Sequence, residues 1–178
     1  IAVPLPVPAL GQLDERVNGA LRDCQPVAVL TTSAVVGDIM TYVGGFTGGA
    51  TPTVVEVDAL DFHSPRTAEM NIGDLPEMAY LQYTSGSTRF PRGTMIPQSA
   101  VMANLHAIFN DGFPLDENDR FCSWLPFYHD MGLVGIVLGC VAMQRSVDYL
   151  PTRDFAMRPR VWLKLPDRRA SHLPLPPS

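Results

Sequence analysis

The feature that most constrains the fold is an alternation, early in the chain, of short apolar runs with segments of helical periodicity. Residues 26–32 (PVAVLTT) and 51–58 (TPTVVEVD) are apolar on both faces, which is typical of buried strands. Residues 33–43 predict a helix with Ser33 as its N-cap, and residues 13–24 have apolar residues at helical spacing. Strands buried on both faces and separated by helices form parallel sheets. The sequence therefore predicts an α/β fold with a mostly parallel sheet.

The same alternation continues from residue 79 onwards. The expected strands are residues 79–84, 93–97, 119–126 and 146–151, and the expected helices are residues 98–110, 131–143 and 153–165. Residues 131–143 are uncharged and apolar, so we expect that helix to be buried. The apolar side of the helix over 98–110 is expected to consist of Val101, Leu105 and Ile108. Thr152 is expected to cap the last helical segment, and Pro159 to divide it.

Length, charge and hydropathy narrow the class of protein. A chain of 178 residues suits one domain with a hydrophobic core. Its net charge of −5 argues against nucleic acid or an anionic membrane surface as the main partner. The longest uncharged apolar run, residues 131–143, is too short to span a bilayer. The opening residues IAVPLPVPAL lack a basic region and are interrupted by prolines, unlike a signal peptide. We therefore expect a protein without a membrane span.

The cysteines agree with an intracellular location. Cys24, Cys122 and Cys140 are far apart and form no CxxC pair. This spacing excludes a disulfide framework or a thiolate zinc site within the chain, and it indicates a reducing compartment. We expect the protein to be cytoplasmic, with its cysteines acting as small buried hydrophobic residues.

The most unusual local feature is the hydroxyl-rich run in LQYTSGSTRFPRGTMI, residues 81–96. Thr84–Thr88 carry four hydroxyls around Gly86, directly after an expected strand. Backbone NH groups and hydroxyls in such a loop can converge as donors on phosphate oxygens, which are all acceptors, and Arg89 or Arg92 can neutralise charge. The run therefore indicates a phosphate-binding loop, with a solvated Ser/Thr loop as the alternative. It is neither a Walker A motif nor a GxSxG nucleophile elbow.

Two motifs resemble one enzyme family. YTSGSTRFPRG, residues 83–93, resembles the phosphate-binding motif [YF]TSGSTGxPKG of the acyl-adenylate-forming ligases. WLPFYHDMGLVG, residues 124–135, is similar to a motif of long-chain fatty acyl-AMP ligases, with relatives in the fatty acyl-CoA ligases. The segment before the first motif also looks like that of the family, so the resemblance covers about residues 1–165. The usual glycine and lysine of the first motif are replaced by Arg89 and Arg92, which leaves open which cation contacts phosphate.

The resemblance implies a reaction and a set of phosphate ligands. In this family a fatty carboxylate attacks the α-phosphate of ATP, pyrophosphate leaves, and an acyl-adenylate remains, with Mg²⁺ usually stabilising the charge. The loop is then expected to bind the β- and γ-phosphates. The residues assigned to the phosphates are Thr84, Ser85, Gly86, Ser87, Thr88 and Arg92.

The second motif implies an acyl site. By resemblance, His129 lies near the acyl carboxylate and the nucleotide and orders the site, while Met131 and Gly132 begin a helix that lines the acyl pocket. A structural role for His129 is the alternative, and Asp130 is interpreted as the cap of the helix that follows it. We expect His129 to line the same cleft as Thr84–Thr88, because loops that follow parallel strands gather at one sheet edge. No residue of the chain is assigned to catalysis or to a metal ion.

Members of this family are several times longer, with further motifs for adenine, Mg²⁺ and ribose and a catalytic lysine. Residues 1–165 are therefore interpreted as a partial AMP-binding (adenylation) domain, and the proline-rich residues 166–178 as an unstructured tail. We expect a truncated fatty acyl-AMP ligase, inactive alone, whose parent transfers a long-chain acyl group to an acyl carrier protein or polyketide synthase. The alternatives are a fragment of a fatty acyl-CoA ligase, with CoA as acceptor, and a non-catalytic remnant with at most weak nucleotide binding.

Overall fold

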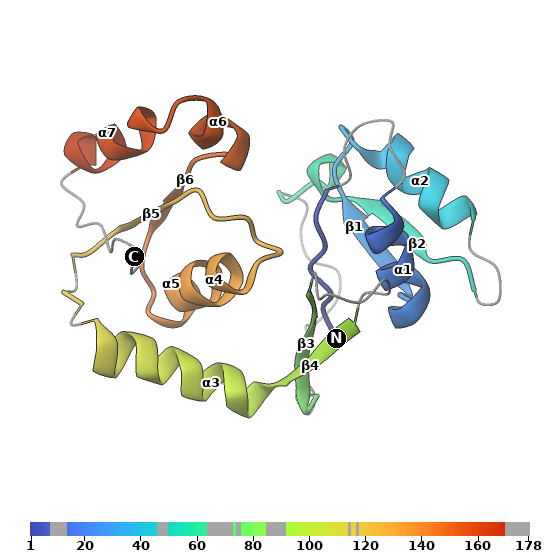
Figure 1. Ribbon diagram of the computed structural model, residues 1–178, viewed down its shortest axis with the longest axis horizontal. Helices are drawn as coiled ribbons and strands as arrows, with labels where there is room; N and C mark the ends of the chain where they lie inside the picture. The colour runs from blue at the N-terminus through green and yellow to red at the C-terminus, as the bar shows by residue number, and fades with distance from the viewer. Residues whose placement is uncertain are drawn as a thin grey trace. The chain divides into compact units, whose positions relative to one another are not determined.

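The structure of the protein is a computed structural model. The residues that the structure describes are 1–7, 14–45, 50–63, 73, 76–84, 92–113, 115–116 and 118–169, of which 166–169 are described as backbone. The chain forms two compact units, Ile1–Met95 and Ile96–Ser178 (Figure 1). Each unit contains a pair of parallel strands together with helices, as the sequence predicts.

A strand–helix–strand arrangement forms the centre of the first unit. Strands β1 (Ala28–Thr31) and β2 (Thr53–Glu56) pair in parallel, with Ala28 opposite Thr53 and Thr31 opposite Glu56. Helix α2 (Val36–Gly44) connects them, and β2 is followed by the 3₁₀ turn η1 (Val57–Ala59). Both predicted strands and the helix between them are therefore present. The expected burial of β1 on both faces is not found, because Leu30 is 69% exposed and Thr31 is the buried residue of this strand.

Helix α1 (Glu15–Cys24) packs on this arrangement through its apolar side. Val17 and Leu21 are buried together with Tyr42 of α2, and the partly buried Val29 of β1 packs against them. The start of α1 is attached to α2, because the backbone NH of Asp14 donates to the Tyr42 hydroxyl at 2.7 Å. Asp14 is also the N-cap of α1 and accepts from the backbone NH of Arg16. The helix predicted over residues 13–24 is thus confirmed, with its cap at Asp14.

Ser33 does not cap α2, contrary to the prediction. The helix begins at Val36, and its N-cap position is Val35, which makes no side-chain cap bond. Ser33 instead binds the carboxylate of Asp58: its backbone NH donates to Oδ1 at 2.9 Å, and its hydroxyl donates to Oδ2 at 2.6 Å. The parallel pairing places the ends of β1 and β2 side by side, which brings Asp58 within reach of Ser33. A charge-assisted bond to a carboxylate is stronger than a bond to a neutral backbone group.

The Ser33–Asp58 contact predicts a pH effect. The hydroxyl of Ser33, and then its backbone NH, lower the pKa of the Asp58 carboxyl. Because the folded pKa is below the unfolded one, the contact stabilises the fold at neutral pH, and this contribution is lost as the pH falls through the folded pKa. In Ser33→Ala we expect the Asp58 titration midpoint, followed by carboxyl carbon NMR, to rise towards its ordinary value. Thr32→Ala retains both donors and should leave the midpoint unchanged; an unchanged midpoint in Ser33→Ala would contradict the assignment.

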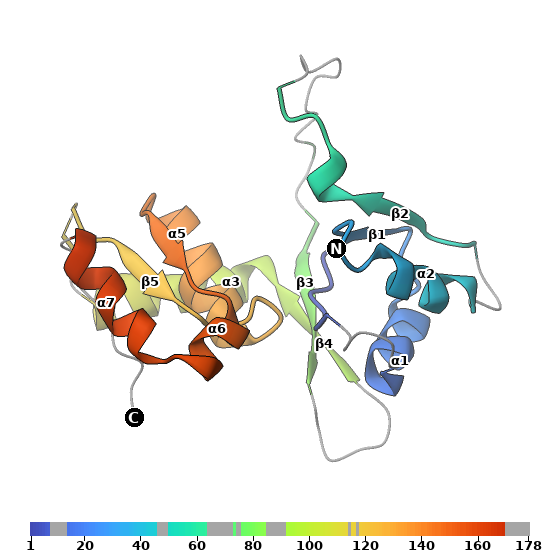
Figure 2. The same cartoon turned by 90° about the horizontal axis from the view of Figure 1, so that it is seen from above.

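Strands β3 (Met78–Thr84) and β4 (Arg92–Pro97) form a second strand pair, as Figure 2 shows. Ala2 forms a parallel bridge with Tyr80, and the backbone NH of Leu81 donates to the Ala2 carbonyl at 2.9 Å. The strand predicted before the hydroxyl-rich run and the strand predicted after it are both confirmed.

The second unit is built around another parallel pair. Strands β5 (Phe121–Ser123) and β6 (Val147–Tyr149) align with Phe121 opposite Val147, and all three β5 residues are buried. The helical segments are α3 (Gln98–His106) with the π-helix η2 (Ala107–Gly112), α4 (Asp130–Gly132) with the π-helix η3 (Leu133–Leu138) and α5 (Gly139–Ala142), then α6 (Thr152–Met157) and α7 (Arg160–Arg169). The strand and helix predictions for this half are confirmed, with shorter strands than the sequence suggests.

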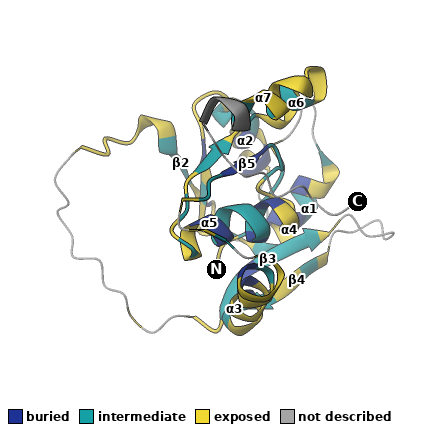
Figure 3. Ribbon diagram, turned by 90° about the vertical axis from the view of Figure 1, so that its left-hand side faces the viewer, coloured by how far each residue is buried: buried dark blue, intermediate teal, exposed yellow. Residues whose placement is uncertain are grey.

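The buried side of the first helical segment of this unit differs from the prediction by one residue. The buried residues are Val101, Leu105 and Phe109, whereas Ile108 is only half-buried. Figure 3 shows the helix α3 coloured by burial, with much of it exposed. The buried residues recur at intervals of four, so Phe109 rather than Ile108 continues the buried side into η2. Phe109 then packs edge-to-face on Phe121, with ring centres 6.0 Å apart.

The helix predicted over residues 131–143 is buried on one side only. Val134 and Cys140 are buried, but Met131 is 47% and Val141 72% exposed. Burial raises the pKa of the Cys140 thiol to about 11, so this thiol is protonated and unreactive at neutral pH. All three cysteines are free. The prediction of a buried helix therefore holds for one side of this helix only, and the expected use of cysteines as small hydrophobic residues fits Cys122 and Cys140.

The last helices differ from the sequence prediction in two ways. Thr152 is the first residue of α6 rather than its cap, and its hydroxyl donates to the Trp124 carbonyl at 2.8 Å. Pro159 separates α6 from α7, as predicted. Helix α7 continues past the proposed boundary at residue 165 to Arg169, although Pro166 lies inside it and has no backbone NH to donate. Residues 170–178 lie outside the described residues. Among the described segments, none forms a helix that is both long and apolar enough to cross a bilayer.

Candidate functional site

The hydroxyl-rich run lies between two paired strands. Thr84 is the last residue of β3 and Arg92 the first residue of β4, and both are exposed. Ser85, Gly86, Ser87 and Thr88 lie outside the described residues, so the phosphate-binding arrangement stays a prediction. The strand that was expected to lead directly into the run is present.

Tyr83 joins the two ends of this motif. Its ring lies on Gly93: a Cβ at Gly93 would be 2.9 Å from Cζ of Tyr83, so a larger residue there would displace the ring. The Tyr83 hydroxyl donates to Oδ2 of Asp23, in the last turn of α1, at 2.6 Å. Burial, followed by this bond to a carboxylate, raises the pKa of Tyr83. The first and last residues of the motif are thus in contact, and the first is attached to α1. Nothing in the pattern around Asp23 indicates this role.

His129 stands at the start of a helix in the second unit. After β5 the chain turns, with the backbone NH of His129 donating to the Pro126 carbonyl at 3.2 Å, and α4 begins at Asp130. His129, not Asp130, occupies the N-cap position, so the interpretation of Asp130 as the cap is wrong by one residue. The Asp130 carboxylate nevertheless accepts from the backbone NH of Met131 at 2.7 Å, because the first helical turn leaves its NH groups without helical partners.

Gly132 allows the helix to pack against the turn that precedes it. A Cβ at this position would overlap the Pro126 carbonyl oxygen and lie 3.1 Å from the Leu125 carbonyl oxygen. Met131 and Gly132 do begin the helix, as predicted. Their place in an acyl pocket stays a prediction; the structure shows instead that Gly132 is needed for this close backbone packing.

Aromatic side chains hold the segment that carries His129. Trp124 stacks on Phe155 of α6 with ring centres 3.9 Å apart and planes at 3°, and Phe155 meets Trp162 of α7 edge-on at 6.0 Å. Phe127 packs edge-to-face on Tyr149 of β6 at 4.6 Å. The residues between β5 and α4 are therefore attached at both ends of the turn. The aromatic residues within the motif were the available signal for this, but their partners follow more than twenty residues later.

The two predicted halves of the site belong to different units. Thr84 and Arg92 lie in Ile1–Met95, and His129 lies in Ile96–Ser178. The expectation that they line one cleft stays a prediction. Within the described residues, no group of three His, Cys, Asp or Glu side chains is placed to hold a metal ion.

Comparison with known proteins identifies the family. The AMP-binding enzyme family matches residues 2–178, and the chain therefore belongs to it. Within that family the relatives include the long-chain-fatty-acid–AMP ligase FadD26 of Mycobacterium marinum, 44% identical over 176 residues that make up 93% of this chain and 29% of that protein. The long-chain-fatty-acid–AMP ligase FadD23 of Mycobacterium tuberculosis is 46% identical over 175 residues, which make up 93% of this chain and 29% of that protein. The chain thus spans about 29% of the length of these relatives.

Two solved structures support the same fold. One comes from structural studies of fatty acyl-adenylate ligases from E. coli and L. pneumophila; it has a TM-score of 0.70 and 46% identity, over 87% of this chain and 27% of that one. The other is the fatty acyl-adenylate ligase from L. pneumophila in complex with acyl adenylate and pyrophosphate. It has a TM-score of 0.66 and 25% identity, over 87% of this chain and 26% of that chain. The predicted α/β fold of an adenylate-forming enzyme and the predicted family resemblance are confirmed.

Proposed function

We propose that the protein to which this chain belongs activates a long-chain fatty acid with ATP, forming an acyl-adenylate and pyrophosphate. The observation that carries the proposal is the 44–46% identity to long-chain-fatty-acid–AMP ligases over 93% of the chain. The position of YTSGSTRFPRG between two paired strands supports it. The acyl group then passes to an acyl carrier protein or polyketide synthase, with CoA as the alternative acceptor.

The reaction joins two anions. A carboxylate oxygen attacks the α-phosphorus, a new C–O–P linkage forms, and the bond to the bridging oxygen breaks so that pyrophosphate leaves with the electron pair. In this proposal the β- and γ-phosphates are bound by Thr84, by the backbone and hydroxyls of residues 85–88, and by Arg92. These groups stabilise the charge on the leaving group. Mg²⁺ accompanies ATP, but the described residues offer no cluster of ligands for it, so we assign none of them to the metal.

The acyl part of the site is assigned to the second unit. His129 would contact the carboxyl group, and Met131 and Gly132 would begin the wall of the acyl pocket. The exposed Met131 side chain is apolar and flexible, which suits contact with an alkyl chain. We place the reaction in the cytoplasm, consistent with three free cysteines.

The test is exchange of labelled pyrophosphate into ATP by the purified protein that carries this chain. We expect exchange that depends on a long-chain fatty acid. A relative named 4-hydroxyphenylalkanoate adenylyltransferase, from Mycobacterium tuberculosis, is 43% identical over 171 residues, so a 4-hydroxyphenylalkanoic acid is the informative second substrate. Exchange with that acid alone would replace the fatty-acid assignment, and absence of exchange with either acid would refute adenylation. The 178-residue polypeptide by itself is expected to give no exchange, because groups that stabilise a transition state act as a unit.

A further inference from the structure

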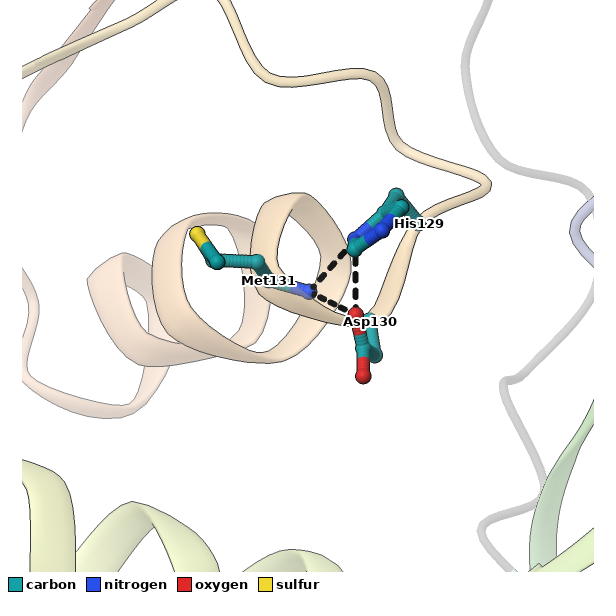
Figure 4. Close-up of polar contacts among 3 residues, drawn as sticks. All are labelled: His129, Asp130 and Met131. Atoms are coloured by element: carbon teal, nitrogen blue, oxygen red, sulfur yellow. Dashed lines mark hydrogen bonds and ion pairs between the residues drawn. The ribbon is translucent and has the colours of Figure 1, made fainter. Parts of the chain in front are cut away.

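Three consecutive residues at the start of α4 form a closed set of polar contacts (Figure 4). Nδ1 of His129 lies 2.6 Å from Oδ1 of Asp130. The backbone nitrogen of Met131 lies 2.7 Å from the same Oδ1 and 3.3 Å from Nδ1. The side chains of His129 and Asp130 are 57% and 71% exposed, so both can meet a ligand or solvent.

Counting protons decides which atom donates in each contact. The Met131 nitrogen has one hydrogen, and the shorter distance directs it to Oδ1. An ionised carboxylate has only acceptors, so the 2.6 Å contact between Nδ1 and Oδ1 requires a proton on Nδ1. If Nδ1 instead accepted from Met131, two acceptors would face each other at 2.6 Å without a proton between them. His129 therefore carries its proton on Nδ1.

We propose that Asp130 is the positioning residue of His129: it holds the proton on Nδ1 and so makes Nε2 the ring nitrogen that meets the ligand. This inference rests on the proposed function for the identity of that ligand, the carboxyl group of the acid. In the doubly protonated ring, Nδ1–H donates to Asp130 and Nε2–H donates to an anionic oxygen of the ligand.

The same geometry shows what happens without the carboxylate. In Asp130→Ala the only remaining partner of Nδ1 in this set is the Met131 NH at 3.3 Å, which requires Nδ1 to accept. The proton of the neutral ring then moves to Nε2, and the bond to Asp130 that orients the ring towards the ligand is lost. Asp130→Asn retains a side-chain oxygen that can accept from Nδ1 and should preserve the original form.

The first test uses histidine ¹⁵N NMR of the purified protein at a pH where His129 is neutral. His129→Gln identifies the signals of His129 among those of the other histidines. We expect the Nδ1–H form in the unaltered protein and in Asp130→Asn, and a change to the Nε2–H form in Asp130→Ala. Asp154→Ala, which removes an acidic residue from the first turn of α6, serves as the matched control and should change nothing. An Nε2–H form in the unaltered protein, or no change in Asp130→Ala, would overturn the proposal.

The second test measures fatty-acid-dependent pyrophosphate exchange in the same variants. We expect Asp130→Ala to lower kcat/KM for the fatty acid about tenfold and to leave the KM for ATP nearly unchanged, with Asp130→Asn close to the unaltered protein. Equal kinetics in all three proteins would refute a positioning role even if the NMR result holds. If the unaltered protein shows no exchange, the proposed function fails, whereas the NMR result still decides whether Asp130 sets the protonation of His129.

Discussion

Gly132→Ala is expected to lower the free energy of unfolding of the Ile96–Ser178 unit by about 3 kcal/mol or more. The added Cβ would overlap the Pro126 carbonyl oxygen and approach the Leu125 carbonyl oxygen to 3.1 Å. Both obstacles are backbone atoms, which cannot move aside without displacing the turn before α4. That turn carries His129, so we also expect the set of contacts between His129 and Asp130 to be disturbed.

The measurement is chemical denaturation followed by tryptophan fluorescence. Both tryptophans of the chain, Trp124 and Trp162, lie in the aromatic cluster of this unit and report its unfolding. Gly135→Ala is the matched control, because a Cβ there meets no atom within 4 Å and the residue lies in the same helical segment. It should be neutral or stabilising by up to about 1 kcal/mol. Equal destabilisation by both substitutions would show that the contact with Pro126 is not the cause.

Replacing Ser87 and Thr88 together by alanine is expected to reduce adenylation about 100-fold or more. This expectation follows from the proposed function, in which both hydroxyls donate to phosphate. Each such bond to a charged group contributes about 1.5–3 kcal/mol, and two of them together correspond to at least two orders of magnitude in rate.

The change should appear in ATP–pyrophosphate exchange, while circular dichroism and the midpoint of unfolding remain close to those of the unaltered protein. Thr53→Ala removes an exposed hydroxyl from β2, outside both motifs, and should leave exchange unchanged. Unaltered exchange in the double variant would mean that the run resembles a phosphate loop without acting as one.

Much of the local structure follows from the sequence because it depends on near neighbours. The period and length of the apolar runs predict β1, β2 and β3 and the helix α2 between the first two, since such a period is visible in a few consecutive residues. Pro159 ends α6 by its own covalent geometry. The two motifs similarly predict the family, which the match over residues 2–178 confirms.

The failures concern polar side chains with more than one possible partner. Ser33 and Thr152 are both good cap residues, yet each hydroxyl binds a group more than twenty positions away, on Asp58 and on the Trp124 carbonyl. Local propensity describes only the competition among near neighbours. Ile108 was expected on the buried side and Phe109 takes its place, because both positions suit a helical period and only the packing of Phe109 on Phe121 distinguishes them.

The sequence by itself determined the class of fold, the family and the positions of the two motifs. Only the tertiary structure decided how the motif residues are held: Tyr83 between Gly93 and the carboxylate of Asp23, sixty positions away in the chain, and Gly132 against the Pro126 carbonyl. It also decided that Asp130 binds His129 rather than capping the helix alone. The physical reason is that strand and helix formation depend on the burial pattern of consecutive residues. The partner of a hydroxyl, a carboxylate or a ring nitrogen depends instead on which distant groups the fold brings within about 3 Å.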